Sequence, residues 1–382
     1  MVALKSRAIR EGAINALDFG ADPTGVLDST SALQAAINAL SDQSNAFVAL
    51  GSVVKDNAQL FIPPGIYKIT SELVWPAGFG DTISGAGVWN TKLRWAGAAG
   101  GHMLRMRNCR DVRLEGLCFD SGGVAIASAI YLQTDDTATD LYISTQNDFY
   151  RVMILGQASA VVGILIDNAV GATDNGDDLH VFDRVLIYDC TESCWKSSTG
   201  EQKDAVFRDC IMAGAPRCIY TTGQGGSFKW YGGFVYNITT AIFHHDSPGD
   251  PVIMQGLDAE NVARLVLWDG ETGNSGPVTI QSCRIATDGL HADGNLCVFG
   301  TQGPFDIRGN TFGQGTYAIP FIKFLTSNQG YAKIECNAFD SRGADVDSPI
   351  RVIVGSVLTF EGSNNYRPTD GSAPLAMAFT DF

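Results

Sequence analysis

The feature that most constrains this chain is a repeat near its C-terminal end. Three segments alternate apolar and polar residues like a strand, continue with Cys or Asn, and place an apolar residue two positions later: Val278–Ile285, Phe305–Phe312 and Ala332–Phe339. Their marker residues Ile280, Ile307 and Ile334 are 27 residues apart. A fixed period of this size predicts a solenoid, in which each turn of chain buries its apolar face against its neighbours.

The same pattern continues towards the N-terminus with less regular spacing. Its markers are Leu114, Phe149, Phe182, Phe207, Trp230 and Ile253, with Phe360 after the clean repeats. A second apolar run follows most markers by about ten residues, as in Gly163–Ile166. Each turn therefore holds at least two short strands that no helix joins. We predict an all-β chain, a right-handed parallel β-helix of about ten rungs; a propeller fits worse because its repeats are longer.

One position in the repeat favours small or amide side chains. Cys210, Cys283, Asn310 and Asn337 occupy the same place after the marker strand. Small residues suit a tight bend, and amide groups can hydrogen-bond to one another along a stack. We expect these residues to form a column at one bend.

Composition narrows the classes of partner. The net charge of −15 argues against a nucleic-acid or anionic membrane surface. The nine cysteines are scattered and odd in number, so we interpret them as reduced, buried small residues. The first residues lack the apolar core of a secretory signal peptide, and no apolar run reaches membrane-spanning length. We expect no membrane insertion and no export by the general secretory route.

The N-terminal residues have a different character. Ala16–Thr30 predicts a short strand and a turn, and Asp28 or Ser29 is a natural N-cap for a helix that continues to Leu40. The expected apolar face of this helix consists of Ala32, Leu33, Ala36, Ile37 and Leu40. Gln59–Thr70 predicts a strand, a Pro-Gly turn and a second strand. Such a segment can cover the open end of a solenoid. We divide the chain into 1–90 as cap and first rungs, 91–366 as β-helix and 367–382 as a tail or cap.

These residues resemble a known family. The motif of Ala16–Ile37 (ALDFGADxTGxxDxTxAxQAAI), Phe61–Tyr67 (FIPPGIY) and Ile83–Gly87 (ISGAG) is similar to the N-terminal motif of the pectate-lyase-like β-helix superfamily, and most similar to bacteriophage tailspike and depolymerase proteins. The resemblance implies a protein, usually a homotrimer on the virion, that binds and often cleaves bacterial surface polysaccharide. The motif names no catalytic residue, and the family includes hydrolases, lyases, esterases and pure binders. The segment before Ala16 is too short for a virion-attachment domain, so a trimmed chain, a short spike held by another protein and a cellular relative all stay open.

Strand alternation predicts which side chains face outwards. If Ile219, Ile242 and Leu265 point into the coil, the residues one and three positions later point out. This places Tyr220, Phe243, His245 and Trp268 on the surface, together with Lys196, while Trp195 points inwards unless the register shifts by one. Flat rings on a solvated sheet suit sugar faces, but they also suit a subunit interface, and the sequence leaves both open.

Carboxylates in neighbouring rungs are the candidate catalytic groups. Asp246 and Asp269 each follow the presumed inward residue by four positions, so we expect them about 5 Å apart in one column. Such a pair can act as the acid and the nucleophile of a retaining glycosidase, with His245 orienting substrate or moving a proton. Ordinary turn chemistry is the alternative. Glu192 competes for the same role, with Trp195 and Lys196 close by.

No residue spacing in the sequence suggests a metal or cofactor site. We therefore predict a tailspike-like glycoside hydrolase without cofactor, with Asp246, Asp269, Glu192 and His245 as catalytic candidates. The predicted sugar-binding residues are Tyr220, Trp268, Lys196, Phe243 and Trp195. A polysaccharide lyase and a non-catalytic carbohydrate-binding or structural spike are the alternatives; a lyase would use Lys or Arg as base.

Overall fold

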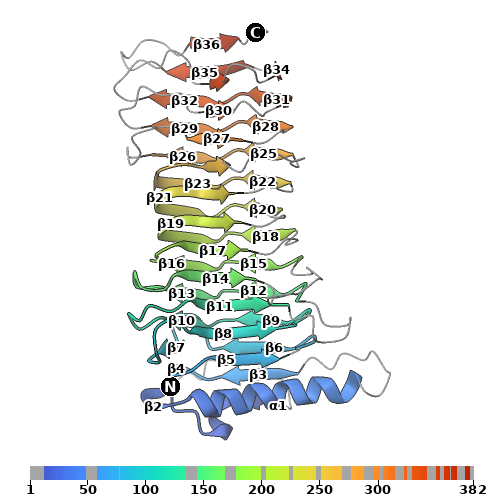
Figure 1. Cartoon of the computed structure of the whole chain (residues 1–382), viewed down its shortest axis with the longest axis vertical. Coiled ribbons are helices and arrows are strands. Elements are labelled where there is room, and N and C mark those ends of the chain that lie inside the picture. Colours follow the sequence, from blue (N-terminus) through green and yellow to red (C-terminus); the bar gives the residue numbers. More distant parts are fainter. Residues whose placement is uncertain are drawn as a thin grey trace, which may run out of the picture. The chain divides into compact units, whose positions relative to one another are not determined.

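The computed structural model is almost entirely built of β-strands that follow one another in parallel coils (Figure 1). It describes residues 13–48, 58–76, 78–134, 144–167, 178–198, 204–222, 227–246, 251–268, 277–287, 296–300, 304–314, 322–324, 329–341, 350–352, 357–361, 363–367 and 375–378. The chain divides into two compact units, residues 1–191 and 192–382. Both units have the architecture of a right-handed parallel β-helix.

The first unit has three parallel ladders. One ladder contains β1 (Ile14–Asn15), β3 (Gln59–Ile62), β6 (Thr82–Gly85), β9 (Arg113–Glu115), β12 (Asp148–Tyr150) and β15 (Val181–Asp183). The second contains β2 (Thr24–Asp28), β4 (Gly65–Ile69), β7 (Thr91–Trp95), β10 (Cys118–Asp120), β13 (Met153–Leu155) and β16 (Leu186–Tyr188). The third contains β5 (Leu73–Pro76), β8 (His102–Arg107), β11 (Ser128–Gln133) and β14 (Val162–Ile166).

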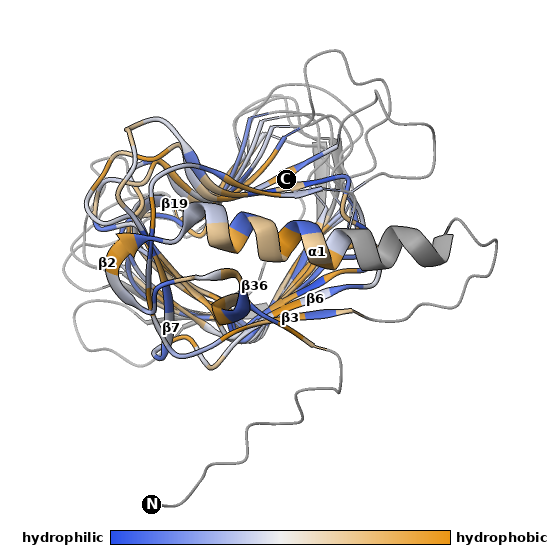
Figure 2. Cartoon of the chain, turned by 90° about the horizontal axis from the view of Figure 1, so that it is seen from below, coloured by the Kyte–Doolittle hydropathy of each residue, from blue (hydrophilic) through white to orange (hydrophobic). Residues whose placement is uncertain are grey.

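A helix covers the first coil of this unit. The helix α1 (Thr30–Val48) begins one residue after Ser29, and the amide of Thr30 donates to Oδ1 of Asp28 over 3.0 Å. All five residues of the predicted apolar face are buried: Ala32, Leu33, Ala36, Ile37 and Leu40. Figure 2 shows α1 lying across the coils. Gln34 exchanges two hydrogen bonds with the backbone of Val74 in β5, so the helix also satisfies groups at the strand edge.

The start of the chain differs from the predicted strand in one detail. Residues Ala16–Phe19 form a 3-10 helix, η1, whose first turn is stabilised by a hydrogen bond from the amide of Leu17 to Asn15 Oδ1. The strands lie on either side of it, in β1 and β2. The turn at Pro63-Pro64-Gly65 is present as predicted, and a side chain at Gly65 would collide with Pro23.

The second unit repeats the three-ladder arrangement. One ladder contains β18 (Ala205–Arg208), β20 (Phe228–Tyr231), β22 (Val252–Gln255), β25 (Val278–Gln281), β28 (Phe305–Arg308), β31 (Gln329–Glu335) and β34 (Val357–Glu361). A second contains the first halves of β19 (Ile211–Thr221) and β21 (Phe234–His245), then β23 (Asp258–Val262), β26 (Arg284–Ala286), β29 (Thr311–Gln314), β32 (Ala338–Ser341), β35 (Ser363–Arg367) and the antiparallel β36 (Leu375–Ala378). The third contains β17 (Ser193–Ser197), the second halves of β19 and β21, β24 (Val266–Trp268), β27 (Cys297–Phe299), β30 (Ile322–Phe324) and β33 (Ile350–Val352).

The predicted column of markers is confirmed in its regular part. Ile280 pairs with Ile307, and Ile307 pairs with Ile334, and all three are fully buried. The marker before them was wrong by one residue, because Met254 and not Ile253 lies between Trp230 and Ile280. Phe360 is also off the column, since it pairs with Ala332.

The amide column at the bend is also confirmed. The Oδ1 atom of Asn310 accepts the amide of Cys283 at 2.9 Å, and Oδ1 of Asn337 accepts the amide of Asn310 at 3.1 Å. The side-chain amide of Asn310 donates to Oδ1 of Asn337 and to the carbonyl of Ile280. Each bend is thereby fixed to the next by buried side chains, which satisfies backbone groups that the ladders leave unpaired.

The interior of both units is packed with aromatic and small side chains. Phe149 and Phe182 stack at 4.8 Å in the first unit, and Trp195 meets Phe207 edge to face at 5.7 Å in the second. Eight cysteines are buried and unbridged as predicted, whereas Cys336 is exposed. Burial raises the pKa of Cys109 and Cys118 to about 12, which keeps both thiols protonated. Within the described part of the chain, no helix combines the length and hydropathy needed to span a membrane.

Candidate active site

One outer face of the second unit brings several reactive side chains together. In the third ladder, Lys196 of β17 lies opposite Tyr220 of β19, and Tyr220 lies opposite His244 of β21. The neighbouring inward row consists of Trp195, Ile219 and Phe243, all buried. Side chains alternate along a strand, so the residues next to this inward row point to the other face of the sheet. These residues are Lys196, Tyr220 and His244.

We call the group on this face the Tyr220 cluster. Its members are Glu192, Lys196, Arg217, Tyr220, His244 and Asp246. Lys196 forms an ion pair with Glu192 at 2.8 Å, and its ammonium lies 5.1 Å from the centre of the Tyr220 ring. The guanidinium of Arg217 lies 4.4 Å from the same ring centre. Two cations and two carboxylates therefore surround one phenol.

Asp246 is the acceptor at the centre of the hydrogen bonds. Its Oδ2 atom receives the hydroxyl of Tyr220 at 2.5 Å, and its Oδ1 atom lies 2.7 Å from Nε2 of His244. The other ring nitrogen of His244, Nδ1, accepts Nε of Arg217 at 2.6 Å. The Asp246 side chain is 36% exposed, so a ligand can reach it. A connected chain of donors thus ends on an accessible carboxylate.

The environment keeps Tyr220 protonated. Burial, followed by the hydrogen bond to Asp246 and the charge of that carboxylate, raises the pKa of Tyr220 to about 12. The nearby Arg217 acts in the opposite direction. The phenol is therefore a hydrogen-bond donor and a possible proton donor, and it is unsuited to act as a base near neutral pH.

Four of the predicted site residues meet in this cluster: Glu192, Lys196, Tyr220 and Asp246. The sequence analysis did not include Arg217 and His244 among the candidate site residues. A local sequence signal could have found them. Arg217 is three residues from Tyr220 near the end of β19, and His244 is two residues from Asp246 at the end of β21.

Three other predictions of outward orientation were wrong. Phe243, His245 and Trp268 are all buried in the coil. Trp268 packs edge to face on His245 at 4.8 Å and on Phe243 at 5.9 Å, and His245 is hydrogen-bonded to Thr221. These residues form part of the core, so they cannot stack on a sugar from solvent.

The physical cause is a bulge in β21. Ala215 pairs with Ile238 and Arg217 with Ala241, so β21 holds one more residue than β19 between these pairs. Ile219 therefore lies opposite Phe243 rather than Ile242, and Phe243 lies opposite Val266 rather than Leu265. A shift of one residue exchanges the inner and outer faces of a strand.

The two remaining predicted site residues, Trp195 and Asp269, are not part of the Tyr220 cluster as described. Trp195 is buried, as its inward assignment predicted, and as placed it has no access to a sugar. Asp269 lies outside the described residues, so its predicted spacing from Asp246 stays a prediction. Among the residues that the structure describes, no group of His, Cys, Asp or Glu side chains has the arrangement of a metal site.

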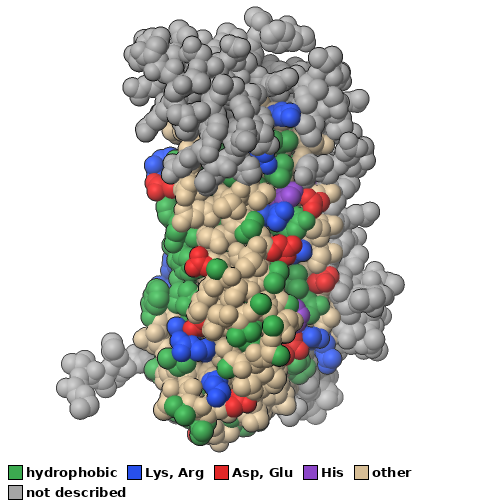
Figure 3. All heavy atoms as spheres, turned by 60° about the vertical axis from the view of Figure 1, so that its left-hand side comes forward, with side chains coloured by type: hydrophobic (Ala, Val, Ile, Leu, Met, Phe, Trp, Pro, Cys, Tyr) green, Lys and Arg blue, Asp and Glu red, His purple; other side chains and the backbone are tan. Residues whose placement is uncertain are grey.

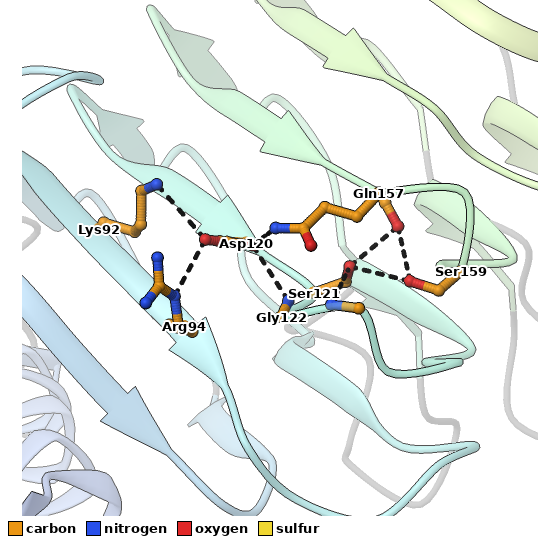
Figure 4. A network of polar contacts seen from close by, with 9 residues as sticks. Lys92, Arg94, Asp120, Ser121, Gly122, Gln157 and Ser159 are labelled. Atoms are coloured by element: carbon orange, nitrogen blue, oxygen red, sulfur yellow. Dashed lines mark hydrogen bonds and ion pairs between the residues drawn. The ribbon is translucent and has the colours of Figure 1, made fainter. Parts of the chain in front are cut away.

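A carboxylate network in the first unit has a contrasting geometry (Figure 4). Asp120 is 1% exposed, and its Oδ2 atom lies 3.3 Å from Nζ of Lys92 and 3.2 Å from Nε of Arg94. Its Oδ1 atom accepts the amide of Gly122 at 3.0 Å and the side-chain amide of Gln157. Every oxygen of this carboxylate is occupied by protein donors, which fits a structural anchor. Elsewhere on the surface, acidic and basic side chains lie beside each other in small groups (Figure 3).

Comparison with known proteins finds a family resemblance at the start of the chain. Residues 13–113 match the family model described as rhamnogalacturonase A/epimerase, pectate lyase-like. This part of the chain is therefore similar to the pectate-lyase-like family. The match covers the cap and the first coils, where the sequence motif lies. No curated protein matches the chain significantly.

Solved structures resemble this β-helix over most of its length. DFA-IIIase from Arthrobacter chlorophenolicus A6 without its lid has a TM-score of 0.64 at 14% identity, with 94% of this chain and 99% of that chain covered. The A-module of the Azotobacter vinelandii mannuronan C-5 epimerase AlgE6 has a TM-score of 0.60 at 13% identity, covering 92% and 93%. ORF18 of Geobacillus virus E2 has a TM-score of 0.50 at 12% identity, covering 93% and 61%. At these identities the likeness is one of fold.

Proposed function

We propose that this β-helix is a tailspike-like depolymerase that binds bacterial surface polysaccharide and hydrolyses it at the Tyr220 cluster. The observation that carries the proposal is the outer face of three successive strands, where Glu192 and Asp246 lie on the two sides of Tyr220. Hydrolysis of a glycosidic bond uses two carboxyl groups that face the same bond. The sequence motif and the match to a pectate-lyase-like family model support a carbohydrate substrate.

The two carboxylates have different surroundings and therefore different proposed roles. The two donors on Asp246, Tyr220 and His244, suit its ionised form, which acts as nucleophile or base. Glu192 then takes the part of general acid. For this role it must carry a proton, so its ion pair with Lys196 has to open when substrate binds.

That requirement favours β-elimination as a second candidate. Lys196 and Arg217 both lie over the Tyr220 ring, and their positive charges can bind the carboxylate of a uronic acid. In this reaction the Asp246 carboxylate can take the proton from the carbon next to the uronate carboxyl. Tyr220, whose pKa is raised to about 12, can give its proton to the leaving oxygen. In this reaction Glu192 stays ionised and its ion pair stays closed.

The similar structures include a viral protein, a mannuronan C-5 epimerase and the catalytic unit of an α-1,3-glucanase from Streptomyces thermodiastaticus. The epimerase and the glucanase support a carbohydrate-related role without choosing the reaction. As part of the same proposal, the protein works as a homotrimer on a phage virion, outside the bacterial cell.

A panel of purified capsules, exopolysaccharides and lipopolysaccharides tests the proposal. Hydrolysis releases new reducing ends without ultraviolet absorbance, whereas β-elimination produces an unsaturated sugar that absorbs in the ultraviolet. Asp246→Asn and Glu192→Gln abolish the product if the cluster is the site. Asp258→Asn is the matched control, because Asp258 is an exposed, ion-paired carboxylate of β23 in the second ladder. Unchanged turnover in both cluster variants would reject the site, and binding without any product would identify a non-catalytic adhesin.

A further inference from the structure

The contact between Arg217 and His244 restricts the protonation of the imidazole. The Nε atom of Arg217 is 2.6 Å from Nδ1 of His244 and points its N–H group at it. A guanidinium keeps its protons at any working pH and has no acceptor atom. Nδ1 of His244 must therefore offer a lone pair, which leaves Nε2 as the position for the single ring proton.

That proton lies where it can be used. Nε2 of His244 is 2.7 Å from Oδ1 of Asp246, so the imidazole donates to the carboxylate. An imidazolium would carry a second proton on Nδ1, directed at the N–H group of Arg217. Such a contact between two donors is repulsive in both charge and geometry. Arg217 thus opposes the ion pair that an isolated His and Asp would readily form.

The other charged groups around His244 do not replace this effect. Tyr220 stacks on the imidazole at 5.0 Å and donates its hydroxyl to Oδ2 of Asp246. Lys196 of β17 pairs with Glu192, the residue just before that strand. In the next strand of the ladder, Leu267 lies opposite His244 and carries no charge. Arg217 is the group that contacts Nδ1.

We propose that Arg217 is a positioning residue that holds His244 as a neutral imidazole with its proton on Nε2. Asp246 then accepts hydrogen bonds from two neutral donors and does not pair with an imidazolium. The consequence for turnover rests on the proposed function, in which Asp246 is the nucleophile or base. The protonation of His244 itself does not depend on that function.

A purely packing role for Arg217 makes a different prediction. Its guanidinium also lies over the Tyr220 ring, 4.4 Å from the ring centre. If this cation–π contact were its whole contribution, replacing Arg217 by Met would keep a side chain over the ring and leave the imidazole unchanged. The hydrogen bond to Nδ1 predicts a change of protonation instead.

Nitrogen-15 NMR of the histidine side chains in the full chain distinguishes a packing role of Arg217 from control of the His244 protonation. The resonances of His244 are assigned by their loss in His244→Gln. In the wild type at pH 7 we expect a proton on Nε2 and none on Nδ1. In Arg217→Met we expect both nitrogens to be protonated, and in Arg217→Lys we expect the wild-type pattern, because the ammonium also donates. A proton on Nδ1 in the wild type, or a wild-type pattern in Arg217→Met, would overturn the proposal.

Turnover of the polysaccharide gives an independent measurement. We expect kcat to fall roughly 10- to 100-fold in Arg217→Met and to recover in part in Arg217→Lys, as for a misplaced acid–base group. Arg217→Ala replaces the Met variant if that side chain prevents folding, which thermal unfolding would show. If the wild type cleaves no polysaccharide, the proposed function fails while the NMR result still decides the role of Arg217.

Discussion

The two carboxylate clusters of this protein contain the same residue type with opposite consequences. Asp120 in the first unit is 1% exposed, and each of its oxygens is held by two donors. Asp246 in the second unit is 36% exposed; its Oδ2 atom accepts from Tyr220 and its Oδ1 atom from His244. A carboxylate that still has access and accepting capacity can meet a substrate, whereas a saturated one only stabilises the fold. The number of hydrogen-bond donors on a carboxylate and its exposed fraction together distinguish a candidate binding residue from one that only stabilises the fold.

The largest expected difference between Asp246 and Asp120 is in polysaccharide turnover. Asp246→Asn should lower polysaccharide turnover by about 10²-fold or more, the usual contribution of an acid–base or nucleophilic group. Asp120→Asn should leave the turnover per folded molecule unchanged, because no substrate reaches its side chain. Initial rates, corrected for the folded fraction, measure both; equal losses in the two variants would remove the distinction.

Stability should show the reverse order. Asp120→Ala leaves Lys92 and Arg94 without their buried partner and should cost about 3 kcal/mol of unfolding free energy, as when one partner of a buried ion pair is removed. Asp246→Ala should cost less than about 1 kcal/mol, because its interactions are partly exposed. Urea unfolding followed by circular dichroism gives both values. A larger loss at Asp246 would mean that its cluster is built for the fold.

A smaller change sharpens the role of the phenol. Tyr220→Phe keeps the ring that stacks on His244 and removes one donor from Asp246, so we expect turnover to fall about tenfold, the value of roughly 1.4 kcal/mol. Tyr150→Phe, on a different ladder of the first unit, is the matched control. No difference between the two variants would show that the hydroxyl has no part in the reaction.

The smallest effect appears at alkaline pH and concerns Tyr67 in the first unit and Tyr220 in the second. Burial raises the pKa of both Tyr67 and Tyr220 to about 12, above the usual value near 10. In the unfolded chain both phenols ionise first, so their contribution to stability is complete below pH 10 and is lost as the pH rises from 10 towards 12. Tyr220→Phe and Tyr67→Phe should each weaken this loss. Unfolding free energies at pH 9 and 11 provide the measurement, and an unchanged slope would contradict it.

Much of the fold was predictable because repetition is visible in sequence. The column of Ile280, Ile307 and Ile334, the Asn310–Asn337 ladder and the apolar face of α1 all follow from spacing alone. The candidate site was predicted only in part. A bulge adds one residue to β21, and no residue type announces it, so the spacing placed Phe243, His245 and Trp268 on the wrong face. Arg217 and His244 each had a local sequence signal, but the contact between them depends on the register that the bulge sets, so spacing alone could not predict that contact.

The side-chain ladder at the bend has an evolutionary consequence. At this bend each acceptor meets a donor 27 residues away, as in Asn310 and Asn337. The unit of sequence that can be inserted or deleted without breaking these contacts is therefore one whole coil. Duplicating such a coil restores every amide contact at the new junction and lengthens the molecule without redesigning it. A gene of this kind can therefore change the number of coils in whole steps, while the Tyr220 cluster elsewhere stays intact.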